Sequence, residues 1–487
     1  MTQLTADCLY EILEYLEDDK FTLYSCILVN RFWCEIAVRI FWRNVCNYNT
    51  LISCLPNKSK EILYENGIFI STLNSKTPIF NYASFCKVLS INLVHYKIGE
   101  LLRNQQNFSS QGLYNNKYII VVQEIFKMFM NQISSLKSLV FLYYSNITFT
   151  LYPGAKDCLK NLTELRCNSN ISSEFFYHLS QICYNIQSLN IKIEGIISNG
   201  LEDLISSQKN LKYFGIELFY YFTDKEFMNT IQLLMSKLPN TLIKLDLLGG
   251  YHCISLSFII NFKNLKELQL SFNLSENFED FEILRYVVFP NLRILKLQHT
   301  RPKFELLINF LENNGKNLKE LYVCEYSGCG DNSLNLAITK FCPNLLKLST
   351  GIKNNELETL KLIFNNCKNL ESIKIWCGDE YLSEKEALEM ILKYSQNNLY
   401  ELILYHLFDA RFKLLPEELE SFFKSWLNFK SQRSISLIIV NYDTNSLDTY
   451  HENIEIINKY IKLGVIKKFK VTDFGDEEFN VSPYFIS

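Results

Sequence analysis

Short phrases of alternating apolar and polar residues recur along most of the chain. Each phrase reads apolar-x-x-apolar-x-apolar, and in nine copies an asparagine directly precedes it. The spacing between copies averages about 26 residues, which is the length expected of leucine-rich repeats and too regular for chance. The first apolar residues of the eleven copies are Leu136, Leu162, Ile186, Leu211, Leu242, Leu265, Leu292, Leu318, Leu345, Leu370 and Leu399.

The end of each phrase predicts a short strand with one buried face, because its last two apolar residues alternate with a polar one, as in Leu295-Lys296-Leu297. Between the phrases lie predicted amphipathic helices. Ser383 with Glu386, and Thr223 with Glu226, have the spacing of a capping box in front of an apolar stripe. One strand and one helix cannot bury their apolar faces alone, whereas stacked copies can.

These units resemble leucine-rich repeats of the longer, helix-containing kind. The resemblance implies an α/β solenoid with parallel strands on the concave face and helices on the convex face. We interpret the recurring asparagine as a loop or helix-terminating residue, because asparagine tolerates the left-handed conformation.

The first forty or so residues follow a different pattern. Leu9, Ile12, Leu13 and Leu16 have the i, i+3, i+4, i+7 spacing of one helix face. Two further apolar stretches, Phe21 to Val29 and Trp33 to Trp42, predict a second and a third short helix. A unit this small is near the lower limit of independent stability, so we expect it to complete its core against a partner or the next domain.

The same segment resembles the F-box motif. The residues that carry the resemblance are Leu4 to Leu16, then Leu28-Val29-Asn30-Arg31-Phe32-Trp33, and finally Phe41-Trp42-Arg43. The segment departs from the motif at Thr5, which replaces a proline, at Asp7, which replaces a glutamate, and at Asn30, which replaces a small residue.

The resemblance implies a docking site for a Skp-type adaptor, which links the chain to a cullin scaffold. Recognition would place apolar anchors at helical spacing into a groove of the adaptor. The residues implied to make this contact are Leu4, Leu9, Ile12, Leu16, Leu23, Val29 and Trp33. The alternative is that these residues form a small cap, which the first repeat needs in any case to cover its apolar end.

We expect three parts along the chain: an F-box-like helical domain over 1–45, a linker and divergent first repeat over 46–132, and a solenoid with a C-terminal cap over 133–487. Phe85 to Ile91 contains a predicted first strand, and Tyr118 to Ile133 a predicted helix with an apolar stripe at Val122, Ile125, Phe129 and Ile133. Ser434–Val440 and Val465–Val471 are predicted to be terminal strands.

Composition and net charge limit the classes of partner and the cellular locations that we expect. Apolar residues make up 48% of the 487 residues, which is typical of a folded chain, and the net charge of −3 gives no overall attraction for nucleic acid or an anionic membrane. No apolar run reaches the ~18 residues of a membrane span, and the N-terminus has no signal-peptide pattern. The fifteen cysteines are irregularly spaced without a CxxC pair, so we expect buried free thiols and a cytoplasmic or nuclear location.

No catalytic or metal-binding pattern is found in the sequence, and no cofactor is expected. The six histidines are isolated, and no phosphate-binding glycine loop occurs. Aromatic residues near the strand ends, Tyr143-Tyr144, Phe219 to Phe222 and Trp376, are interpreted as core fillers, with a substrate-binding surface as the alternative. The sequence thus predicts a non-enzymatic receptor that holds an unidentified protein substrate for ubiquitination; a repeat scaffold unrelated to ubiquitin is the alternative.

Overall fold

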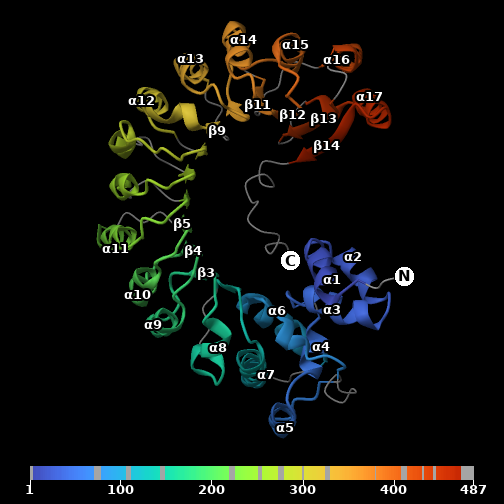
Figure 1. Cartoon of the computed structure of the whole chain (residues 1–487), viewed down its shortest axis with the longest axis vertical. Coiled ribbons are helices and arrows are strands. Elements are labelled where there is room, and N and C mark those ends of the chain that lie inside the picture. Colours follow the sequence, from blue (N-terminus) through green and yellow to red (C-terminus); the bar gives the residue numbers. More distant parts are fainter. Residues whose placement is uncertain are drawn as a thin grey trace. The chain divides into compact units, whose positions relative to one another are not determined.

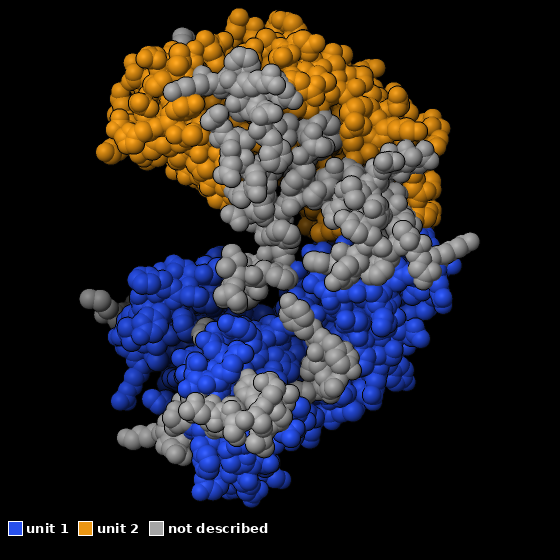
Figure 2. All heavy atoms as spheres, turned by 180° about the vertical axis from the view of Figure 1, so that it is seen from behind, with its two compact units in different colours: residues 1–220, 224–241 blue, residues 221–223, 242–487 orange. Residues whose placement is uncertain are grey.

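The computed structural model describes residues 4–45, 47–70, 78–105, 111–142, 148–218, 225–249, 255–272, 279–298, 301–323, 330–378, 380–406, 414–429, 433–441 and 446–472. The chain forms two compact units (Figure 2). Unit 1 comprises residues 1–220 and 224–241, and unit 2 comprises residues 221–223 and 242–487. Each unit is a stack of strand-and-helix repeats, and unit 1 also carries the N-terminal helices.

Unit 1 begins with helices and continues with alternating strands and helices. Its elements are α1 Ala6–Glu14, α2 Lys20–Ile27, α3 Arg31–Phe41, α4 Tyr48–Ser53, α5 Asn57–Glu65, η2 Tyr82–Phe85, β1 Val88–Ser90, α6 Ile91–Gln105, α7 Gln111–Gln132, β2 Ser138–Phe141, η3 Phe149–Leu151, α8 Ala155–Leu159, β3 Glu164–Asn168, α9 Ser173–Ile182, β4 Ser188–Ile193, α10 Gly200–Ser207, β5 Tyr213–Leu218 and α11 Lys225–Ser236.

Unit 2 repeats the same alternation, with 3-10 helices replacing some α-helices. Its elements are β6 Lys244–Gly249, η4 Leu256–Asn261, β7 Glu267–Ser271, η5 Glu279–Leu284, β8 Ile294–Leu297, α12 Phe304–Asn314, η6 Gly315–Asn317, β9 Glu320–Val323, α13 Asn332–Phe341, β10 Lys347–Thr350, α14 Leu357–Asn366, β11 Ser372–Cys377, α15 Glu384–Tyr394, β12 Glu401–His406, α16 Pro416–Phe429, β13 Ile435–Val440, η7 Leu447–Thr449, α17 His451–Lys462 and β14 Ile466–Thr472.

Within each unit the strands are parallel and follow one another in sequence order. Figure 1 shows that the strands line the inner side of each unit's curve and that the helices lie on its outer side. This arrangement confirms the predicted α/β solenoid of parallel strands and helices. The predicted strands near residues 88, 435 and 466 are β1, β13 and β14, and the predicted helix around residue 125 lies within α7.

The repeated leucines form the core that joins neighbouring repeats. Parallel pairing places Leu268 opposite Leu245 and Leu295, and Leu321 opposite Leu295 and Leu348, so that one buried row runs along the strands of unit 2. All five of these leucines are buried, as are the first apolar residues of all eleven phrases. Each repeat therefore covers the apolar face of the one before it, as the sequence predicts.

The predicted capping box at Ser383 is confirmed. The Ser383 side chain accepts a hydrogen bond from the backbone N–H of Glu386, and the Glu386 carboxylate accepts one from the backbone N–H of Ser383 at 2.9 Å. The Thr223 to Glu226 box lies partly outside the described residues. The buried cysteines, among them Cys183 and Cys367, have no disulfide partner among the described residues, and burial raises the pKa of each of these two thiols to about 12.

The asparagines before three consecutive phrases, Asn291, Asn317 and Asn344, make contacts that the sequence did not reveal. In each of them the side-chain Nδ2 donates a hydrogen bond to a carbonyl oxygen of the preceding repeat. Asn291 donates to Lys263, Asn317 donates to Pro290, and Asn344 donates to Lys316. The donor–acceptor distances are 3.3, 3.2 and 2.9 Å. This asparagine ladder satisfies loop carbonyls and connects consecutive repeats along one edge of the sheet.

Replacing Asn344 with Ala is expected to lower the free energy of unfolding of unit 2 by about 1 kcal/mol, because one inter-repeat hydrogen bond is lost. The check is urea denaturation of the full chain. Asn398→Ala is the matched control, since its amide lies 3.5 Å from the Lys368 carbonyl oxygen and contributes a weaker bond. Equal losses in the two variants would contradict the ladder's contribution.

Candidate functional site on the N-terminal helices

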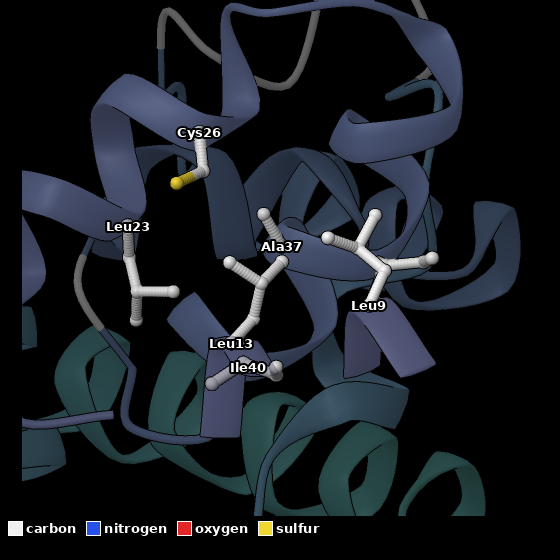
Figure 3. Close-up of a cluster of buried hydrophobic side chains, with 7 residues drawn as sticks. Leu9, Leu13, Leu23, Cys26, Ala37 and Ile40 are labelled. Atoms are coloured by element: carbon white, nitrogen blue, oxygen red, sulfur yellow. The ribbon is translucent and has the colours of Figure 1, made fainter. Parts of the chain in front are cut away.

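The first three helices enclose a core of their own. Seven side chains from α1, α2 and α3 form this cluster (Figure 3), and each has at most 9% of its surface exposed. The cluster consists of Leu9, Leu13, Leu23, Cys26, Ile36, Ala37 and Ile40. The three helices thus fill their interior without a partner protein, contrary to the expectation that a partner completes it.

A polar side chain caps the start of each helix. Thr5 accepts from the backbone N–H of Cys8 at 3.4 Å, Asp19 from that of Thr22 at 3.0 Å, and Asn30 from that of Trp33 at 2.9 Å. The hydrogen bond from the Thr22 hydroxyl, followed by that from its backbone N–H, lowers the pKa of Asp19. Thr5 and Asn30, two departures from the F-box pattern, are therefore N-caps that hold the helices in place.

The structure separates the seven predicted contact residues into three groups. Leu9 and Leu23 are fully buried in the three-helix core, where they have no exposed surface to offer a partner. Leu16 and Trp33 are partly buried and pack against that core. Leu4, Ile12 and Val29 are exposed, with 49% to 57% of their surface accessible. Leu9 and Leu23 therefore stabilise the packing of the three helices and do not contact a partner.

Further exposed apolar side chains lie on the same helices and were not singled out from the sequence. Phe21 and Tyr24 on α2 and Leu28, its C-cap residue, form a stripe at i, i+3 and i+7, in which Phe21 is 84% exposed. Ile12 on α1 is followed three residues later by the C-cap residue Tyr15, which is 91% exposed. Helical spacing places the members of each stripe on one face. We call Ile12, Tyr15, Phe21, Tyr24 and Leu28 the α1–α2 apolar stripes.

Arg43 fastens this helical unit to the first strand. Its guanidinium pairs with Glu14 and Glu17 and donates to the Tyr10 hydroxyl at 2.6 Å. Burial opposes the charge on Arg43, but the hydrogen bonds that it donates to Glu14 and Tyr10, together with the charge of Glu17, raise its pKa above the ordinary value. The Arg43 carbonyl accepts from the backbone N–H groups of Lys87 and Val88. The helices are therefore held against β1 in a defined orientation.

The side chains on the inner face of the strands in unit 2 change from charged to aromatic along the unit. On β6 to β8 its residues are polar and paired: Glu267 lies 3.1 Å from Lys244 and 3.0 Å from Lys296. On β11 and β12 the corresponding residues include Trp376 and Tyr405, whose ring centroids lie 4.2 Å apart. Both rings are buried, which fits the prediction of Trp376 as a core filler. The other predicted aromatic clusters, Tyr143-Tyr144 and Phe219 to Phe222, lie outside the described residues.

Neither a metal site nor a membrane-spanning helix is found in the part of the chain that the structure describes. No three His, Cys, Asp or Glu side chains there come close enough together to hold an ion. None of the helices described is both long and apolar enough to cross a bilayer.

Comparison with solved structures finds weak likenesses, two of them to leucine-rich repeat proteins. The yeast Rad7–Elc1 complex contains a chain 14% identical, matched over 73% of this chain and 89% of that one with a TM-score of 0.39. The leucine-rich repeat-containing protein LegL7 from Legionella pneumophila is 16% identical over 62% and 92% of the two chains, with a TM-score of 0.32. A leucine-rich repeat protein of Leptospira interrogans is 18% identical over 74% and 89%, with a TM-score of 0.32.

No protein-family model and no curated protein matches the sequence. The architecture is accordingly assigned from the strand order and the leucine rows of this chain.

Proposed function

We propose that this chain is a substrate-recognition adaptor of a Skp-cullin-F-box ubiquitin ligase. In this role α1 to α3 bind a Skp-type adaptor, which links the chain to a cullin, and the repeats hold a protein substrate. The observation that carries the proposal is the exposure of the α1–α2 apolar stripes on helices whose own core is already complete. Exposed apolar side chains at helical spacing on short helices are typical of a protein-binding surface.

The proposed contribution to ubiquitination is positional. The proposal places the adaptor on the helices at one end of unit 1, which Arg43 and the β1–β2 pairing attach to the first repeats, and the substrate on the repeats of the same chain. Linking the two raises the effective concentration of a substrate lysine near the conjugating enzyme. Covalent chemistry then belongs to other subunits, and we propose that this chain is not an enzyme.

The alternative is a repeat scaffold unrelated to ubiquitin, in which the N-terminal helices only cap the solenoid. The contacts of Arg43 and Asn44 with Val88 favour this role, since they cover the exposed edge of β1. A cap needs an inner apolar face but has no use for an outer one. The apolar stripes are thus the feature that separates the two functions.

The experiment is affinity purification of the tagged full chain from its native cells, with the bound proteins identified by mass spectrometry. The proposal predicts a Skp-type adaptor and a cullin together with a substrate. Recovery of other proteins with neither the adaptor nor a cullin would instead support the scaffold.

A further inference from the structure

One edge of unit 2 carries two rows of cationic side chains. Lys266, Arg293 and Lys319 each follow the first leucine of a phrase, and Lys263 and Lys316 each precede the asparagine. The Lys266 carbonyl accepts from the backbone N–H of Arg293, and the Arg293 carbonyl accepts from that of Lys319. The three cations of the first row therefore lie on consecutive repeats, one strand spacing of about 4.8 Å apart.

A groove of about 220 Å³ lies at this edge. Three of its lining side chains are the cations Arg293, Lys316 and Lys319, and the lining includes no carboxylate. The remaining lining residues are Pro290 and the ladder asparagines Asn291, Asn317 and Asn344. Each of these carboxamides uses Nδ2 to reach the preceding repeat and keeps a second N–H proton for another acceptor.

Within the part of the chain that the structure describes, these charges lack the carboxylate partners that neighbouring lysines have. Lys244, Lys296 and Lys347 on the inner face lie within 3.6 Å of Glu267 or Glu320. By contrast, the described carboxylates include none within ion-pair distance of Arg293, Lys316 or Lys319. A cluster of cations without a described carboxylate partner, on a chain of net charge −3, is a local positive potential that attracts anions.

Interactions with helix ends explain only some of these cationic residues. Lys263 follows η4 and Lys316 lies in η6 directly after α12, where a cation complements the negative end of the helix dipole. Arg293 and Lys319 instead lie directly before strands β8 and β9, where no such helix end requires them. The positive charges of Arg293 and Lys319 are therefore not explained by helix ends.

We propose that this cationic edge binds an acidic segment of a partner polypeptide. This proposal rests on the proposed function. The segment of the substrate that binds here is a run of Asp and Glu residues that lies across the strands. Arginine and lysine pair with its carboxylates, and the asparagine amides donate further hydrogen bonds. A single-stranded nucleic acid is a poorer fit, because its bases need aromatic platforms, which the groove lining lacks.

The test uses the full chain and a fluorescein-labelled octaglutamate peptide, followed by fluorescence anisotropy at several salt concentrations. Octaglutamine is the uncharged control peptide. Wild type is expected to bind octaglutamate with an affinity that falls as salt rises. The variant Arg293→Glu/Lys316→Glu/Lys319→Glu is expected to bind at least about tenfold more weakly, because three attractive contacts become repulsive.

The matched control is Lys340→Glu/Lys393→Glu/Lys462→Glu, which makes the same charge change on exposed residues of α13, α15 and α17. It is expected to keep most of the affinity. Equal loss in both triple variants, or no preference of wild type for octaglutamate over octaglutamine, would overturn the proposal. Tighter binding of oligothymidylate than of octaglutamate, lost in the groove variant, would also overturn it in favour of nucleic acid.

Two further measurements keep the outcome interpretable. A neutral variant, Arg293→Gln/Lys316→Gln/Lys319→Gln, with an unchanged denaturation midpoint must also lose peptide affinity, so that misfolding cannot imitate the result. Skp-type adaptor binding by the groove variants is expected to be unchanged. If the chain binds the acidic peptide but not the adaptor, the proposed ligase role is wrong and the acidic-ligand proposal stands. If it binds the adaptor but not the peptide, only the acidic-ligand proposal is wrong.

Discussion

Replacing Ile12 and Phe21 together with glutamate is expected to weaken binding of a Skp-type adaptor by at least about 100-fold. Both side chains are exposed, at 49% and 84%, and neither belongs to the three-helix core. In the complex each would be buried against apolar groups, where a carboxylate without a partner is costly. Glutamate is also a good helix former, so α1 and α2 should persist. The measurement is isothermal titration calorimetry with purified adaptor.

The control for this pair is Tyr177→Glu/Leu233→Glu. These residues are similarly exposed, at 52% and 47%, and lie on α9 and α11 within the same unit. The control should bind the adaptor as wild type does. Adaptor affinity that survives the Ile12 and Phe21 substitutions unchanged would contradict the placement of the contact on the α1–α2 apolar stripes.

Replacing Glu384 with Ala is expected to lower the free energy of unfolding of unit 2 by about 3 to 5 kcal/mol. Glu384 is 4% exposed, and one of its carboxyl oxygens lies 2.8 Å from Nε2 of His406. The same oxygen accepts from the backbone N–H of Leu447 at 2.9 Å. This carboxyl group thus joins α15, β12 and η7, and its removal leaves two buried polar groups unsatisfied.

Chemical denaturation of the full chain measures the loss. Glu384→Gln retains an oxygen at the same place and is expected to lose less than the alanine variant. Glu358→Ala removes a carboxylate from an exposed pair with Lys361 and should change stability by less than about 1 kcal/mol. A Glu384→Ala variant as stable as Glu358→Ala would show that the buried network contributes little.

The repeat architecture could be predicted because its signal is local and repeated. Every phrase places its leucines at the same spacing, and a strand with a period of two leaves one choice for the buried face. The helix around Phe129 and the cap at Ser383 were predictable for the same reason, since their spacing is contained in a few neighbouring residues. Stacking then followed from the need to cover each repeat's apolar side.

The outward face of the N-terminal helices could not be predicted in this way. In α2, Leu23 and Phe21 are both apolar, yet the first is fully buried and the second is exposed. Spacing within one helix does not say which apolar side chains turn towards α1 and α3, because packing between helices decides it. The resemblance to the F-box motif groups Leu9 and Leu23 with the implied contact residues, and it does not single out Phe21, Tyr24 or Leu28.

The asparagine ladder and the cationic edge were missed for a related reason. Both arise from residues about 26 positions apart that parallel stacking brings together, such as Arg293 and Lys319. The signal was present in the sequence, since Lys263-Asn264-Leu265-Lys266 and Lys316-Asn317-Leu318-Lys319 share one pattern. It becomes meaningful once the register of the repeats places those positions in one row.

The most direct measurement of the central claim is hydrogen–deuterium exchange of the full chain with and without a purified Skp-type adaptor. The account predicts slower exchange in the peptides that cover α1 and α2 when the adaptor is present, with the strands of unit 2 unchanged. Unchanged exchange throughout the chain at saturating adaptor, or protection confined to the repeats, would contradict it.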